Sequence, residues 1–155
     1  MHARRAVIAG ILSIIATGTA PGASASAIDH IVTALEQDRV DRVEIVRIPR
    51  EVASRTAFTP EMLEGGYYYK LLIRHVRAPK LRDAMIRSLK GLAVEPSPER
   101  ADLRWGMLVF LKGDVRVGSI YMDEDRRNGT VDGRPVRFRG DALAWLKPFL
   151  GDGFY

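Results

Sequence analysis

The chain of 155 residues contains no cysteine. This absence excludes disulfides, thiolate metal sites and the lipid-bearing cysteine of a bacterial lipoprotein. Histidine is scarce as well, and beyond residue 25 only His30 and His75 are present, with no His-x-x-x-His or His–Glu pairing. We therefore expect both to be structural or surface histidines, and the sequence predicts no metal site and no cofactor.

Recognisable catalytic motifs are also lacking. The chain has no glycine-rich phosphate loop, and Ser119 is expected in mid-strand without the second glycine of a nucleophile elbow. The acidic run from Asp123 fails as a calcium loop, because Arg127 and Asn128 stand at its fifth and sixth positions, where such a loop needs an oxygen ligand and glycine. A divalent ion held loosely by Asp123 and Asp125 is the alternative. The sequence thus favours a protein that is not an enzyme, with a small hydrolase of dispersed carboxylates as the alternative.

The N-terminus provides the clearest positive signal. Residues 1–5 are cationic, residues 6–20 are apolar and uncharged, and residues 21–25 are small and end in Ala-Ser-Ala. This order is typical of a secretory signal peptide, and the apolar stretch is shorter than the roughly 20 residues that a spanning helix needs. We predict a signal peptide over residues 1–25, cleaved after Ala25 or one register later after Ala27. The protein would then be periplasmic or secreted from a bacterium, with no transmembrane segment after cleavage; a retained anchor is the alternative.

Residues 26–155 are predicted to form a single α+β domain, with a mainly antiparallel sheet of about four to five strands and helices packed on it. Ile28, Ile31, Val32 and Leu35 have helical spacing, with Ser26 as the expected cap. Another helix is expected from Pro79 to a C-terminal cap at Gly91, and residues 94–101 are expected to be a loop. A last short helix after Asp141 should turn Leu143, Leu146 and Phe149 inward.

Two tight hairpins define the predicted sheet. Residues 103–111 and 115–122 flank a two-residue turn at Gly113-Asp114, so that paired positions sum to 227 and Gly106 lies opposite Tyr121. Both faces of this hairpin are apolar, which indicates a central position covered on both sides, or one face kept for a partner. Asp132-Gly133 forms the second turn, and Pro135 places the strand after it at a sheet edge.

Positive charge is uneven along the chain. Residues 70–90 contain seven basic residues and one acid, a net charge of +6. Because arginine binds carboxylate and phosphate with two hydrogen bonds, we take two basic sets as candidate binding residues. They are Arg74, Arg77, Lys80, Arg82, Arg87 and Lys90, and in the last hairpin Arg134, Arg137 and Arg139. A solvated helix face is the plainer interpretation of the first set.

The run Tyr67-Tyr68-Tyr69 after two glycines is a further candidate for recognition, although such a run more often packs one ring and exposes the next. These features together predict a non-catalytic protein-binding module of the bacterial envelope, of inhibitor or immunity type, whose partner is an acidic envelope or secreted protein. Anionic lipid or glycan is the alternative ligand. Nucleic acid is disfavoured, because the chain carries an export signal and no aromatic–basic recognition motif.

Overall fold

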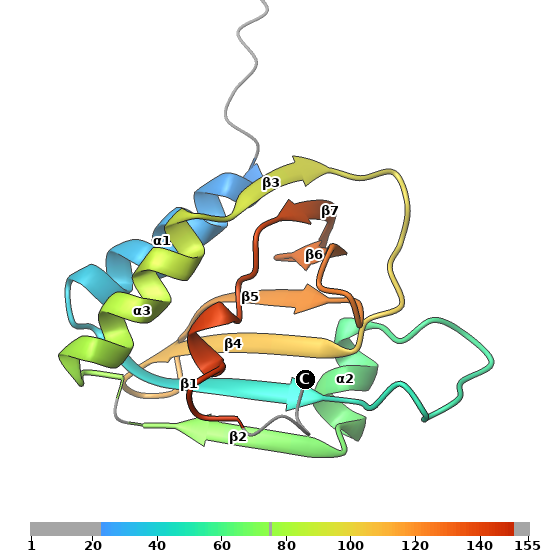
Figure 1. The fold of residues 1–155 in the computed structure, drawn as a ribbon, viewed down its shortest axis with the longest axis horizontal. Coiled ribbons are helices and arrows are strands. Elements are labelled where there is room, and N and C mark those ends of the chain that lie inside the picture. Colours follow the sequence, from blue (N-terminus) through green and yellow to red (C-terminus); the bar gives the residue numbers. More distant parts are fainter. Residues whose placement is uncertain (1–22, 75, 151–155) are drawn as a thin grey trace, which may run out of the picture.

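A computed structural model of the chain describes residues 23–74 and 76–150, and the fold within them is α+β (Figure 1). Most of the predicted signal peptide and His75 lie outside these residues. The helices are α1 (Ala23–Glu36), α2 (Pro60–Gly66), α3 (Pro79–Lys90) and the short 3₁₀ helix η1 (Ala144–Leu146). The strands are β1 (Val40–Arg47), β2 (Tyr69–Ile73), β3 (Ala93–Pro96), β4 (Trp105–Leu111), β5 (Arg116–Met122), β6 (Asn128–Val131) and β7 (Arg134–Arg139).

The described strands form one antiparallel sheet in the order β2-β1-β4-β5-β6-β7-β3, so β2 and β3 lie at its opposite edges (Figure 1). This confirms the α+β class, but the sheet has seven strands and not four to five. Strand β3 falls in the segment expected to be a loop. It is short and contains Pro96, and it is held by long-range pairing with β7, which local sequence patterns do not reveal.

One face of the sheet carries α1, α3 and η1 over the larger core. The predicted apolar stripe of α1 is confirmed, since Ile28, Ile31, Val32 and Leu35 are all buried. Ser26 lies inside α1, which is already helical at Ala23, so it is not the cap of this helix. No helix within the described residues is long and apolar enough to cross a membrane.

The other face of the sheet is only half covered. Above β1, β4 and β5, α2 and neighbouring loops enclose a second core that includes Ile48, Phe58, Leu63 and Leu108. Strand β4 is consequently buried over most of its length, which confirms that the β4–β5 hairpin is central and covered on both sides. Over β6, β7 and β3 this face is lined by exposed polar residues, among them Arg137.

The β4–β5 register follows the predicted sum of 227 from Trp105↔Met122 to Val109↔Gly118 and then shifts at a bulge before Phe110↔Arg116. The shift arises because the turn has three residues rather than two: Leu111 N donates to Val115 O at 2.8 Å. Gly106 does lie opposite Tyr121. A Cβ there would be 2.7 Å from Val46 Cγ2, so only glycine fits between these neighbours.

Three further expectations concern segment ends. Asp132 and Gly133 both have positive φ, 46° and 78°, as the predicted type I′ turn requires. Gly91 is the C-terminal cap of α3, as predicted, but its φ of −80° is right-handed and not the left-handed value of a Schellman ending. Leu143 and Leu146 are buried as predicted, but Phe149 is 61% exposed, because η1 spans only three residues before the chain turns away.

Pro135 does not place β7 at an edge, since β3 pairs on its outer side. Pro135 O accepts a hydrogen bond from Ser97 N at 3.1 Å, so its nitrogen, which lacks a hydrogen, also faces β3. The N–H that Pro135 lacks would have faced Ser97, which lies just beyond the end of β3 at Pro96. One hydrogen bond is therefore lost at the end of a ladder, and the strand pair tolerates it.

Candidate interaction surfaces

Three of the predicted basic residues, in α3 and just before it, lie beside acids of neighbouring segments. Arg77 and Arg82 both approach the carboxylate of Asp38, with Nη1 of Arg82 at 3.3 Å. Lys90 Nζ lies 2.6 Å from Glu36 Oε1 at the end of α1. These ion pairs connect α3 and the residues just before it to the end of α1 and the turn that follows it. Ion pairs this exposed contribute up to about 1 kcal/mol each.

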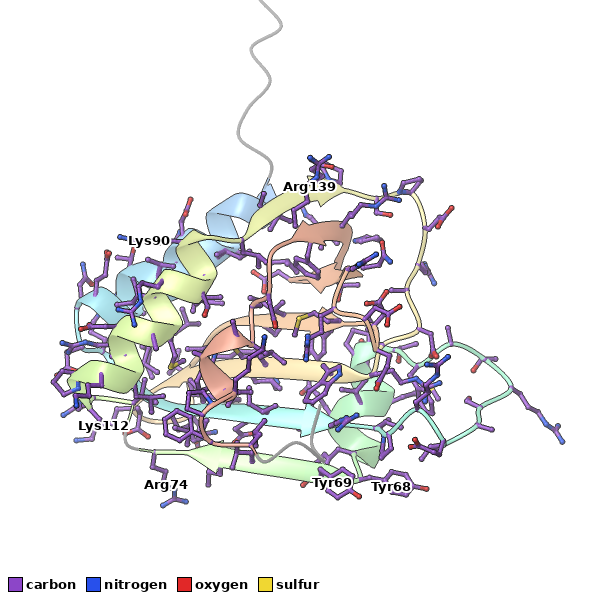
Figure 2. The ribbon with its side chains drawn as sticks, viewed as in Figure 1. Tyr68, Tyr69, Arg74, Lys90, Lys112 and Arg139 are labelled. Carbon is purple, nitrogen blue, oxygen red and sulfur yellow. The ribbon has the colours of Figure 1, made fainter. Side chains whose placement is uncertain are left out.

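The structure does not bring the two basic sets together. Arg137 and Arg139 alternate along β7 with the buried Val136 and Phe138, so they lie on the face opposite to the helices, and Arg134 is exposed beside the last turn. Arg139 is 3.1 Å from Glu95 across the β3–β7 pair. Lys90 at the end of α3 and Arg139 beside β3 are marked in Figure 2. The predicted sites thus form separate surfaces and not one anionic-ligand site.

The most distinctive surface is the free edge at β2. Seven large apolar or aromatic side chains are exposed among the described residues, and five of them belong to α2, to β2 or to the residues between them. We call these five the tyrosine edge: Met62, Tyr67, Tyr68, Tyr69 and Leu72. The three tyrosines are 39%, 64% and 51% exposed, so the expectation that one ring packs while the next is exposed is wrong. Figure 2 shows Tyr68, Tyr69 and Arg74 along this edge.

The backbone of β2 is also available on its outer side. Ile48 N donates to Arg104 O, so the backbone N–H and C=O groups of Ile48 face β4. The same holds for every second residue before it, because backbone groups alternate in direction along a strand. Arg47, Ile45 and Val43 therefore face β2, where their partners are Tyr69, Leu71 and Ile73. The residues between these partners, Lys70 and Leu72, direct their N–H and C=O groups away from β1. The outer edge of β2 thus presents two backbone donors and two backbone acceptors. No further strand of the described sheet pairs with them.

Helix α2, which contributes Met62 to the tyrosine edge, is held to β5 by the carboxylate of Glu64. Thr59 caps the helix by accepting from Met62 N, and Leu63 is fully buried in the second core. Glu64 accepts two hydrogen bonds from Arg116, at 3.0 and 2.6 Å, and a third from the hydroxyl of the buried Tyr121. The hydrogen bonds from Arg116 lower the pKa of Glu64, and burial together with Glu64 raises the pKa of Tyr121 to about 12.

A cleft of about 530 Å³ lies where the N-terminus of α2 meets the β6–β7 hairpin. It is walled by Phe58, Pro60, Leu103 and Pro135, and none of the predicted binding residues lines it. Thr130 Oγ1, also in its lining, is buried without a hydrogen-bond partner among the described residues. The hydroxyl of Thr59 and the carboxylate of Glu61 also line it, but Thr59 caps α2 and Glu61 interacts with it in the first turn of that helix.

The acidic run lines a second cleft, where Glu124 lies 3.2 Å from Arg47 of β1 and Asp123 is used within its own loop. Asp123 Oδ1 accepts from the backbone nitrogens of Arg127 and Asn128, at 2.9 and 3.2 Å, and Oδ2 accepts from the Asn128 amide. Within residues 23–74 and 76–150, no three acidic or histidine side chains are grouped so that they could hold a metal ion. The run therefore closes a strand connection between β5 and β6.

The fold and these surfaces define an α+β domain with one exposed, tyrosine-bearing sheet edge. No protein-family model matches the chain, and neither curated protein sequences nor solved structures gave a match. The signal for the tyrosine edge was present in the sequence as the run from Tyr67 to Tyr69. The sequence could not show that β2 is an edge strand, because this depends on which strands pair with β2 in the folded sheet.

Proposed function

We propose that this chain is a non-catalytic protein-binding domain of the bacterial envelope, which takes an extended segment of a partner protein as an added strand on β2. The observation that carries the proposal is the coincidence of unpaired backbone groups with the tyrosine edge. Strand addition uses backbone hydrogen bonds for affinity and side-chain contacts for specificity. Tyrosine suits side-chain recognition, because its ring gives a large contact area and its hydroxyl can stay in contact with water.

Lysine on an edge strand commonly discourages pairing with other chains, so the position of Lys70 bears on the proposal. Its ammonium lies 2.9 Å from Glu44 Oε2 on β1, and Glu44 also accepts from Arg42 Nε at 2.9 Å. Burial opposes ionisation of Glu44, but the hydrogen bonds from Lys70 and Arg42 outweigh it and lower the pKa of Glu44. The Lys70 side chain is thus bound inward, and its charge does not oppose an incoming strand.

The partner segment should be apolar on alternate residues and acidic at one end. Leu71 and Ile73 pack on the larger core from the helix-covered face of β2, and Leu72 is exposed on the opposite face. Arg74, just beyond β2, is exposed and has no ion pair with another described residue. A carboxylate at the end of the added strand would pair with it. This agrees with an acidic envelope or secreted protein as the partner.

Photocross-linking in the native envelope tests the proposal. A photoreactive phenylalanine analogue replaces Tyr68 in the full chain and, as matched controls, Val115 or Phe149, which are also large, exposed and apolar. We expect position 68 to yield a specific protein adduct that neither control gives. Leu72→Pro, which removes an outward N–H, should abolish the adduct, whereas Leu72→Ala should retain it. Equal adducts at all three positions, or an adduct that survives Leu72→Pro, would contradict strand addition.

A further inference from the structure

The positive charges of α3 and of Arg77, just before it, are paired with acids on one side of the helix and not on the other. Toward α1, the cations Arg77, Arg82 and Lys90 lie beside Asp38 and Glu36. Toward η1, Lys80 and Arg87 are exposed and have no ion pair with another described residue. Their seven-residue spacing puts them two turns, about 10 Å, apart on the same side of the helix. The uncompensated charge of α3 is therefore confined to the side that faces η1.

An apolar groove of about 480 Å³ lies between these two cations and η1. Leu81 and Ala84 of α3 form one wall, and Trp145, Pro148 and Phe149 form the other. Phe149 is largely exposed, so the groove continues into an apolar surface. Trp145 is buried, and its indole nitrogen has no hydrogen-bond partner among the described residues. An unused donor is unusual in a protein interior, and this one belongs to a residue that lines the groove.

We infer that this groove binds a single-chain amphiphile with an anionic head group, such as a long-chain carboxylate. The alkyl chain would lie on Leu81, Trp145 and Phe149, and removal of this surface from water would drive binding. The head group would meet Lys80 and Arg87, whose long side chains can converge on one anion. Charge complementarity selects an anion, because no acidic residue lines the groove. The site lies on α3 and η1, apart from the β2 edge, and it does not depend on the protein-binding proposal.

Titration of the full chain with laurate brominated on its alkyl chain, kept below the micelle concentration, tests this inference. Bromine quenches a tryptophan that it contacts, and the chain has two tryptophans. We expect saturable quenching that disappears in Trp145→Phe and weakens at least tenfold in the double variant Lys80→Gln/Arg87→Gln. The matched control Arg77→Gln/Lys90→Gln removes the same charge from the other side of α3 and should change affinity less than twofold. Absence of quenching, or equal weakening in both double variants, would overturn the inference.

A second arm separates a free amphiphile from a membrane surface as the source of the anion. Co-sedimentation with phosphatidylglycerol vesicles is measured in the same buffer and with the same variants. Laurate binding that the neutral methyl ester does not reproduce supports the groove as a site for one molecule. Binding to vesicles without binding to monomeric laurate would overturn it in favour of a membrane-surface contact, which should weaken steeply with salt.

Discussion

The two edges of the sheet differ in how they meet solvent. At β3, Ser97 N donates to Pro135 O, which turns Ser97 and Glu95 toward β7 and leaves Val94 and Pro96 facing outward. Pro96 has no N–H to offer, so this edge presents a single donor. At β2, both outward residues, Lys70 and Leu72, can donate. Proline and shortness are common ways of protecting a sheet edge, and only β3 has the proline.

The side chains reinforce this difference. Beside β3, the opposed charges of Glu95 and Arg139 pair with each other. Beside β2, α2 and the residues after it present the tyrosine edge, and the Glu64–Arg116–Tyr121 contacts hold that helix to β5. An exposed apolar edge is an aggregation hazard, and a protein that protects one edge could protect the other. The open edge at β2 is therefore unusual within this sheet, and the proposed strand addition would account for it.

The largest expected effect separates the inward from the outward residues of β2. Leu71→Pro removes an N–H directed at β1 and packing on the larger core, and it should lower the free energy of unfolding by about 3 kcal/mol or more. Leu72→Pro removes only an outward N–H and should cost less than about 1 kcal/mol. Urea denaturation followed by circular dichroism measures both. Equal losses would mean that the assigned hydrogen-bonding direction of β2 is wrong.

Loss of the Glu64 contacts should have an intermediate effect. Glu64→Ala leaves the hydroxyl of the buried Tyr121 without its carboxylate partner, and we expect a loss of about 1–2 kcal/mol in the free energy of unfolding. A double-mutant cycle with Tyr121→Phe isolates the interaction, because Tyr121→Phe alone keeps the ring in the second core. A coupling energy near zero would show that the Tyr121 hydroxyl does not help to hold α2 through Glu64.

The lowered pKa of Glu64 predicts that the free energy of unfolding depends on pH in the acid range. The pKa of Glu64 is lowered in the folded chain, so its stabilisation is fully present above the ordinary value of 4.5 and is lost as the pH falls through the lowered folded value. The stability difference between the natural chain and Glu64→Gln should therefore shrink in that acid range. Urea midpoints between pH 3 and pH 7 measure it, and a constant difference would contradict the assignment.

Tyr68→Ser should affect binding more than folding. The side chain is 64% exposed, so the free energy of unfolding should change by less than about 0.5 kcal/mol. Affinity for the cross-linked partner should fall about tenfold, as expected for an aromatic anchor of an interface. Calorimetric titration against Val115→Ser as the control separates the two effects. An unchanged affinity would remove Tyr68 from the interface.

The smallest expected effect concerns the proline at the β3 edge. Pro96→Val restores an outward N–H on β3 and should leave stability within about 0.5 kcal/mol while making self-association detectable at high concentration. Sedimentation velocity over a range of concentrations measures it. If Pro96→Val stays as monomeric as the natural chain, proline is not what protects β3.

Local patterns predicted the elements that depend on neighbouring residues. The α1 stripe from Ile28 to Leu35 and the type I′ turn at Asp132 both follow from short-range geometry. The central β4–β5 hairpin was predicted because both of its faces are apolar. Strand β3, the position of β7 and the exposure of all three tyrosines could not be predicted, because each depends on pairing between segments distant in the sequence.

The candidate site was predicted less well than the fold. A run of basic residues looks the same in sequence whether acids distant along the chain compensate it or not, and Asp38 and Glu36 compensate Arg82 and Lys90. Only Lys80 and Arg87 of that set line the apolar groove. The run of tyrosines was recognised as a candidate, but the open backbone beside it follows from strand order alone.

Amide hydrogen exchange of the free chain, resolved by residue with NMR, tests whether the outer edge of β2 is open. If it is open, exchange should alternate along β2: slow at Tyr69, Leu71 and Ile73, whose N–H groups face β1, and fast at Lys70 and Leu72, whose N–H groups face outward. Addition of the cross-linked partner should slow the second group alone. Protection of Lys70 and Leu72 in the free chain would mean that the β2 edge is already covered, and it would contradict strand addition.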